Sequence, residues 1–320
     1  MVNANSRQFH MEPSPEFNDA CINAIREYLR GAVPFRETIN KIESLRDHAI
    51  AENHLPNQAR SEHALGYLQH YRGNLNTSIQ HYEQARTLFK KVNNPTRMAT
   101  MDLNQGENYR FKGDFNRALQ LYRSAYQTAK DLSAVRTQTI AALNEGLVLI
   151  TLEQNTSAMQ TFHHVEDLLQ QWDREDSSLP GFLCELHHGK AVVYLRQNQL
   201  EEAWHSAQRA LEIADATGEP HQRGYANRTM GEVLCQLGRT MDDDHPDDPD
   251  DYFRASGTAF REINAEAELA RTMYAQALSQ ARRGRRTMAA RKLQYVMIMF
   301  TKLGMVDDAA RAAEAQLAVL

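Results

Sequence analysis

The sequence predicts an all-α protein, a right-handed α-solenoid of about seven helix–turn–helix units followed by a C-terminal capping helix. Gly66, Gly106 and Gly146 recur at a spacing of 40 residues, and small and aromatic residues follow each glycine at constant offsets. Between the nine prolines run helical patterns that lack the two-residue alternation of strands. A fixed period of this length is typical of stacked helical units that bury a continuous core.

Composition excludes several functional classes. At 320 residues the chain exceeds the size at which one hydrophobic core usually stops growing, which favours two domains or a repeat array. A net charge of −5 argues against a general affinity for nucleic acids, and three cysteines indicate neither a disulfide framework nor a zinc site. Because the first residues lack the apolar core of a signal peptide and no long apolar run follows, we expect a cytoplasmic protein without a membrane span.

Each unit repeats one internal order. Twelve residues after the first glycine comes a small residue, and four residues later an aromatic one; for Gly106 these are Ala118 and Tyr122. A glycine inside a helix costs roughly 1 kcal/mol relative to alanine. We expect contact between helices to offset this cost, with small residues allowing close approach and the aromatic ring filling the wedge between units. Gly113 is expected to end the first helix in a left-handed conformation.

The stretch LNQGENYRFKGDFNRALQLYRSA (Leu103–Ala125) resembles the tetratricopeptide repeat. It carries most of that signature at Gly106, Tyr109, Gly113, Ala118, Tyr122 and Ala125. The resemblance extends over about residues 17–303. The period of 40 residues rather than the usual 34 implies longer helices, similar to kinesin light chains, MalT-like proteins and bacterial peptide-sensing regulators of this repeat class.

The resemblance implies a division of the chain into a tail, a superhelix and a cap. Residues 1–16 are expected to form a flexible N-terminal tail, residues 17–303 the superhelix and residues 304–320 the capping helix. Its units are expected near residues 17–55, 56–94, 95–133, 134–173, 179–217, 219–264, which contains an acidic insertion at 242–251, and 265–303.

In such a superhelix the first helix of each unit lines a concave groove, so the resemblance implies a partner site there. The apolar stretch TIAALNEGLVLI of the fourth unit predicts either a floor for partner side chains or a surface that the next superhelical turn covers. Asn104 and Asn144 could bond an extended peptide backbone or a neighbouring helix. The expected groove residues are His63, Tyr67, His70, Asn104, Glu107, Arg110, Phe111, Asn144, Leu147, His188, Tyr225 and Arg228.

Two charged runs complete the pattern. The acidic run DDDHPDDPDD (Asp242–Asp251) lacks the glycine and the glutamate of an EF-hand loop, and we expect a solvated loop, with cation binding left open. The basic run RRGRR (Arg282–Arg286) lies in the turn of the seventh unit. Because turns within units emerge on one edge of a solenoid, we expect the two runs to pair there, with little energetic effect if exposed.

No phosphate-binding loop, nucleophile elbow or metalloprotease motif occurs in the sequence, so we expect no enzyme, no catalytic residue, no metal and no cofactor. The sequence predicts a non-catalytic scaffold that holds a partner peptide or protein segment in the groove. The alternative is a regulatory sensor whose superhelix changes conformation when it binds a signalling peptide or small ligand. We expect neither nucleic acid nor a membrane as a partner.

Overall fold

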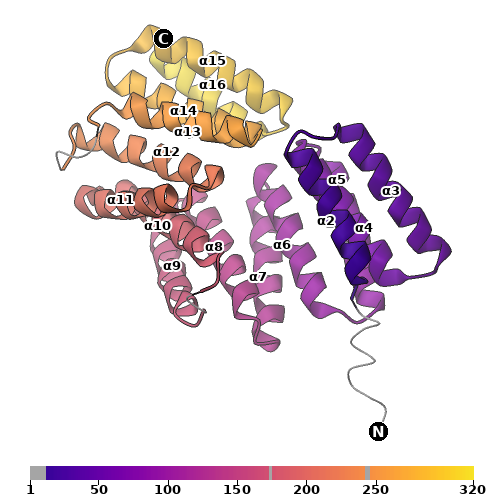
Figure 1. The fold of residues 1–320 in the computed structure, drawn as a ribbon. Coiled ribbons are helices and arrows are strands. Elements are labelled where there is room, and N and C mark those ends of the chain that lie inside the picture. The colour runs from indigo at the N-terminus through magenta and orange to yellow at the C-terminus, as the bar shows by residue number, and fades with distance from the viewer. Residues whose placement is uncertain (1–11, 173–174, 242–245) are drawn as a thin grey trace. The chain divides into compact units, whose positions relative to one another are not determined.

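The computed structural model describes residues 12–172, 175–241 and 246–320, and these residues form fifteen helices and no strand (Figure 1). The helices follow one another as seven consecutive pairs and a last helix, α16, so the predicted all-α repeat fold is confirmed. None of the described helices combines the length and apolar character that crossing a membrane requires.

Contacts divide the chain into two compact parts, and the division falls inside helix α8 (Val135–Thr151). The N-terminal part, Met1–Ala141, contains α2 (Pro15–Leu29), α3 (Phe35–Ala51), α4 (Leu55–Tyr71), α5 (Leu75–Lys91), α6 (Pro95–Phe111) and α7 (Phe115–Asp131). The C-terminal part, Ala142–Leu320, contains α9 (Asn155–Leu169), α10 (Leu179–Arg196), α11 (Leu200–Thr217), α12 (Pro220–Leu237), α13 (Pro249–Glu262), α14 (Glu266–Arg282), α15 (Arg286–Lys302) and α16 (Val306–Val319).

The period of 40 residues follows from the lengths of the helices. From α4 to α7 each helix has 17 residues, and three-residue connections separate them. Gly113 ends α6 with φ of +81°, the left-handed conformation predicted for it, and Asn93 takes a φ of +55° between α5 and α6. Glycine adopts this conformation without strain and asparagine tolerates it, so both residues allow tight turns.

The repeated glycines leave room for aromatic rings. A Cβ atom at Gly66 would stand 2.6 Å from the ring of Tyr82, which belongs to the second helix of the same pair. Tyr82 also belongs to a buried cluster that contains Met101 of α6, in the next pair, which agrees with an aromatic residue that fills the space between units. The ring of Phe162 lies against Gly146 of its own pair and also against Gly189 of the next pair.

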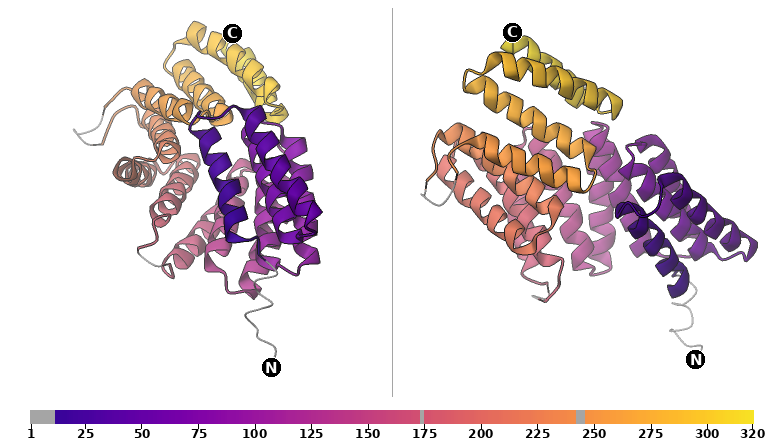
Figure 2. Two further views of the ribbon diagram at one scale, coloured as in Figure 1. Left: turned by 45° about the vertical axis from the view of Figure 1, so that its right-hand side comes forward. Right: turned by 45° about the horizontal axis from the view of Figure 1, so that its top comes forward.

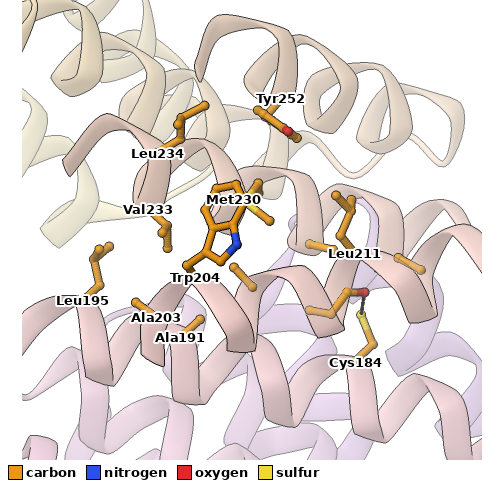
Figure 3. Packing of buried hydrophobic residues seen from close by; sticks show 14 residues of the cluster. Cys184, Ala191, Leu195, Ala203, Trp204, Leu211, Met230, Val233, Leu234 and Tyr252 are labelled. Carbon is orange, nitrogen blue, oxygen red and sulfur yellow. Dashed lines mark hydrogen bonds between the residues drawn. The ribbon is translucent and has the colours of Figure 1, made fainter. Parts of the chain in front are cut away.

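Small and large residues interlock in the core of the C-terminal part (Figure 3). Trp204 of α11 packs with Met230 and Val233 of α12, above alanines of α10 and α11. The Cys184 thiol donates a hydrogen bond to the carbonyl of Ala210 at 3.4 Å, and burial raises its pKa to about 12. This thiol is therefore protonated and unreactive at neutral pH, and it serves to fill the core.

The two charged runs meet, as predicted. The Arg283 guanidinium contacts the Asp248 carboxylate at 2.7 Å, and Arg285 contacts Asp250 at 2.8 Å. The expectation of a solvated loop is wrong at Asp250, because this residue lies in the first turn of α13 and is only 8% exposed. Residues 242–245 of the acidic run lie outside the described residues.

The described end of the N-terminal tail contacts the helices. The backbone N–H of Ser14 donates to Asn57 Oδ1 at 2.9 Å, and Glu12 contacts Arg97 of α6 at 2.9 Å. Residues 1–11 of the expected tail lie outside the described residues.

Candidate functional site

The twelve expected groove residues all lie on first helices of pairs. Eleven are half-buried, and Arg228 is buried. Those on α4 and α6 form one cluster in the N-terminal part, and those on α10 and α12 form another in the C-terminal part. The set comprises His63, Tyr67 and His70 on α4; Asn104, Glu107, Arg110 and Phe111 on α6; Asn144 and Leu147 on α8; His188 on α10; and Tyr225 and Arg228 on α12.

The N-terminal cluster centres on the ring of Phe111. The Arg110 guanidinium lies over this ring, 4.8 Å from its centroid, and the His70 ring of α4 approaches it to 5.4 Å. Beside them on α4, the rings of Tyr67 and Tyr71 stack at 6.3 Å. An arginine on an aromatic face is held by the ring quadrupole, so the cluster offers a partly exposed surface of fixed geometry.

Arg110 is paired with a carboxylate. Its Nε donates to Glu107 Oε2 at 2.9 Å, and the Tyr122 hydroxyl donates to the same oxygen at 3.0 Å. Burial alone would raise the pKa of Glu107, but the charge and hydrogen bonds of Arg110 outweigh it and lower that pKa to about 2. Burial in turn raises the pKa of Tyr122 well above its ordinary value. Glu107 therefore stays ionised and Arg110 stays in place at neutral pH.

A chain of hydrogen bonds fixes His70. Its Nδ1 lies 2.7 Å from Asn108 Oδ1, Asn108 Nδ2 donates to the Ser78 hydroxyl at 2.8 Å, and Ser78 donates to the carbonyl of Gly66 at 2.7 Å. With the amide in this orientation, the imidazole donates from Nδ1. Sequence reasoning missed Asn108, because Leu68 and Val148 occupy the equivalent positions of the neighbouring units and no repeat marks it.

Asn104 faces a histidine of the neighbouring helix. Its Nδ2 lies 3.0 Å from His63 Nε2, so of the two alternatives for Asn104 the bond to a neighbouring helix is the one found. Burial, with Arg60 and Arg97 nearby, lowers the pKa of His63 to about 3, and the neutral ring therefore accepts this bond at pH 7. His63 Nδ1 is buried without a partner among the described residues. The role of Asn144 stays a prediction.

The C-terminal cluster centres on Tyr225. The His188 ring of α10 lies 5.2 Å from it, the Arg228 guanidinium covers it at 5.0 Å, and Phe260 of α13 meets it edge to face at 5.4 Å. His188 is held through its Nδ1 by the hydroxyl of Thr229, which itself donates to the carbonyl of Tyr225. The structure thus brings His188, Tyr225 and Arg228 together as one surface.

Arg228 is bound within the protein. Its guanidinium contacts Glu268 of α14 at 2.7 Å, and both side chains are buried. Burial would lower the pKa of Arg228, but Glu268 and the neighbouring Tyr225 and Glu232 raise it. Its charge is therefore matched by Glu268, and its contribution to the surface is the flat guanidinium against Tyr225. Sequence reasoning missed Glu268 because nothing in the repeat pattern pairs α12 with α14.

A cleft of about 930 Å³ opens between α9 and α10, and sequence reasoning did not find it. Leu179, Leu183 and Leu186 of α10 form its apolar wall, and Glu166 of α9 lies on the rim beside Lys190 at 2.7 Å. It occurs where the repeat is interrupted, because the connection between these helices, residues 170–178, is longer than the usual three. The broken period was the signal available in the sequence.

Comparison with known proteins identifies the repeat. The pattern described as a tetratricopeptide repeat matches residues 57–131, which span α4 to α7 and contain the N-terminal cluster. These residues are tetratricopeptide repeats. The resemblance predicted from the glycine spacing is thereby confirmed, although a search of curated proteins finds no match.

Solved structures share this fold at low sequence identity. Aspartyl phosphate phosphatase F from Bacillus subtilis has a TM-score of 0.66 at 13% identity, over 82% of this chain and 64% of that one. The Rap conjugation gene regulator of plasmid pLS20, in complex with the Phr* peptide, has a TM-score of 0.62 at 13% identity, over 96% and 97%. The apo quorum sensor NprR from B. thuringiensis has a TM-score of 0.58 at 8% identity, over 94% and 86%. The tetratricopeptide fold of these regulators is therefore the fold of this chain.

Proposed function

We propose that this tetratricopeptide-repeat chain is a non-catalytic interaction module that binds a peptide or protein segment on the first helices of its pairs. The observation that carries the proposal is the stack of Arg110 on Phe111 beside His70. Aromatic and arginine side chains held in fixed positions are the residues that most often anchor a binding partner. Their partial burial leaves surface that a partner can still cover.

The fold comparisons favour a peptide as the partner. One structure of this fold is a complex with the Phr* peptide, and another is a quorum sensor.

The three cysteines are free thiols, which agrees with a reducing cytoplasm as the place of action.

The electrostatics of the N-terminal cluster support binding rather than catalysis. The pKa values of Glu107, about 2, and His63, about 3, lie far from neutrality. A general acid or base works best when its pKa is close to the working pH.

Selection of random peptides on the immobilised full chain tests the proposal. We expect the enriched peptides to bind Phe111→Ala about tenfold or more weakly, the effect of removing one anchor residue. Leu132→Ala, in the exposed connection after α7, is the matched control and should bind them unchanged. Equal binding to wild type and Phe111→Ala would refute the site.

The sensor is the second candidate, favoured by the likeness to the quorum sensor NprR. Hydrogen exchange with a selected peptide separates the two candidates. A sensor should change amide protection in helices that the peptide does not touch, whereas a scaffold should change it only at the contact.

A further inference from the structure

The outer face of α15 differs from the outer faces of α5 and α7, the second helices of two regular pairs. Eight positions of α5 are exposed, at Asn76, Thr77, Gln80, Glu83, Gln84, Thr87, Lys90 and Lys91, and all are polar. The equivalent eight of α7 are also exposed and polar. In the same register, α15 exposes Met288, Tyr295 and Ile298, at 55%, 56% and 46%. Since the repeat needs no apolar residue here, these three side chains form an apolar stripe that packing inside the chain does not explain.

The charges beside this stripe are all of one sign. Arg286, Arg291 and Lys302 are exposed on α15, and the helix contains no acidic residue. The face therefore fits a surface that is both apolar and acidic.

Such a surface lies on the neighbouring helix. In α16 the apolar residues Val306, Ala310, Ala313, Leu317 and Leu320 follow one another at spacings of four and three, the pattern of a coiled-coil seam. Val306, Leu317 and Leu320 are exposed at 69%, 76% and 83%. Asp307, Arg311 and Glu314 are exposed along this seam, and together with the half-buried Asp308 they give α16 a net negative charge.

The register of the repeat explains why this seam is open. Aligned from the start of each helix, Leu317 occupies the position that Gly106 holds in α6, and Gly106 is covered by Tyr122 of the following helix. In α16 no described residue covers the equivalent face.

We propose that a second copy of this chain covers both faces, with α15 of each copy packed on α16 of the other in a two-fold symmetric dimer. The two helices lie side by side at the C-terminal end (Figure 2), so one symmetry axis can bring both contacts together. Pairing α15 with α15 would place only basic residues opposite each other, and pairing α16 with α16 would bring together two helices of net negative charge. The crossed pairing sets the basic helix α15 against the net acidic helix α16.

Light scattering of the full chain during size-exclusion chromatography tests the dimer. We expect a mass of twice the chain's 36.5 kDa. Tyr295→Asp on α15 and Leu317→Asp on α16 should each raise the dimer dissociation constant about tenfold or more, because each places a carboxylate in an apolar contact. Leu132→Asp introduces the same charge at an exposed apolar residue elsewhere and should leave the dimer intact.

Charge reversal tests the crossed pairing. One variant carries Arg286→Glu, Arg291→Glu and Lys302→Glu, and the other carries Asp307→Lys and Glu314→Lys. Each alone should be monomeric, because its α15 and α16 then have the same sign, but the mixture should form a heterodimer.

Three results would overturn the proposal: a wild-type monomer at every concentration, a dimer that survives Tyr295→Asp, or a mixture that stays monomeric. Circular dichroism confirms that each variant is folded. If an aspartate variant unfolds, Tyr295→Ser and Leu317→Ser replace it with the same expectation.

Discussion

The ring of Tyr122 lies on Gly106, where a Cβ atom would stand 2.6 Å from Tyr122 Cε1. The hydroxyl of the same tyrosine donates to Glu107 at 3.0 Å, and Glu107 holds Arg110 of the N-terminal cluster. One side chain thus joins the packing of the repeat to the candidate site. Changes at Gly106 and Glu107 should therefore have effects that the repeat pattern alone would not predict.

Substituting Gly106 should destabilise the protein although alanine favours helices. Overpacking a core lowers the free energy of unfolding by about 1–3 kcal/mol. The higher helix propensity of alanine offsets roughly 1 kcal/mol of this loss. We expect Gly106→Ala to lower the free energy of unfolding by up to about 2 kcal/mol in urea titrations. Gly257→Ala of α13 is the control, because its Cβ would meet nothing closer than 3.5 Å and should stabilise the helix. If Gly106→Ala is instead more stable than the wild type, the ring of Tyr122 moves aside without cost.

The pKa of Glu107 predicts a pH-dependent contribution to stability. Its pKa falls from 4.5 to about 2 on folding, so the folded state prefers the ionised carboxylate. The stabilisation is fully present above pH 4.5 and is lost as the pH falls toward 2. We expect Glu107→Gln to cost about 3–4 kcal/mol at pH 7, from about 1.4 kcal/mol per pKa unit, and much less at pH 3. Glu83→Gln, on the exposed face of α5, is the control and should leave the free energy of unfolding unchanged at both pH 7 and pH 3.

Arg110 should show strong coupling to Glu107. Arg110→Ala leaves a half-buried carboxylate without its cation, so we expect a loss of about 2–4 kcal/mol in the free energy of unfolding. The double variant Glu107→Gln/Arg110→Ala should cost clearly less than the sum of the two single changes. If the losses measured in urea titrations are additive, the interaction between Glu107 and Arg110 does not stabilise the protein. Because of this coupling, Phe111→Ala is the better variant for binding studies.

His63 should make the protein sensitive to mild acid. Its pKa is about 3 in the folded state and 6.5 ordinarily, so the unfolded chain binds a proton first. The stability that depends on the neutral ring is complete above pH 6.5 and declines as the pH falls toward 3. We expect thermal melts of His63→Gln to depend less on pH across this window than melts of the wild type. Identical slopes for the two proteins would argue against a neutral, buried His63.

Asp250 should stabilise the start of α13. It contacts Arg285 at 2.8 Å and accepts a hydrogen bond from Gln276 at 2.9 Å; burial opposes the ionised form, but its partners keep the pKa of Asp250 below its ordinary value. Hydrogen bonds to a charged group contribute about 1.5–3 kcal/mol, so Asp250→Asn should lower the unfolding free energy by roughly that amount. The adjacent Asp251→Asn is the control, since its ion pair with Arg254 is exposed. Equal effects of the two substitutions would show that the contact with Arg285 contributes nothing.

The repeat could be predicted from the sequence because local geometry enforces it. A helix places Gly106 at a fixed distance along the chain from the turn at Gly113, and the next helix places Tyr122 over the glycine. These spacings recur in every regular unit, so they are visible as a period. The meeting of the two charged runs could also be predicted, because turns within units share one edge of the stack.

The partners of the site residues could not be predicted in this way. Asn104 faces His63, Arg228 faces Glu268, and His70 is fixed by Asn108, and each pair joins helices of different units. Such contacts depend on which side chains come within about 3 Å across the stack, a distance that sequence spacing does not encode. The sequence by itself therefore determined the helices, their turns and the helix faces that carry the candidate residues. Only the tertiary structure decided which of those residues are bound within the protein, because hydrogen bonds form between neighbours in space.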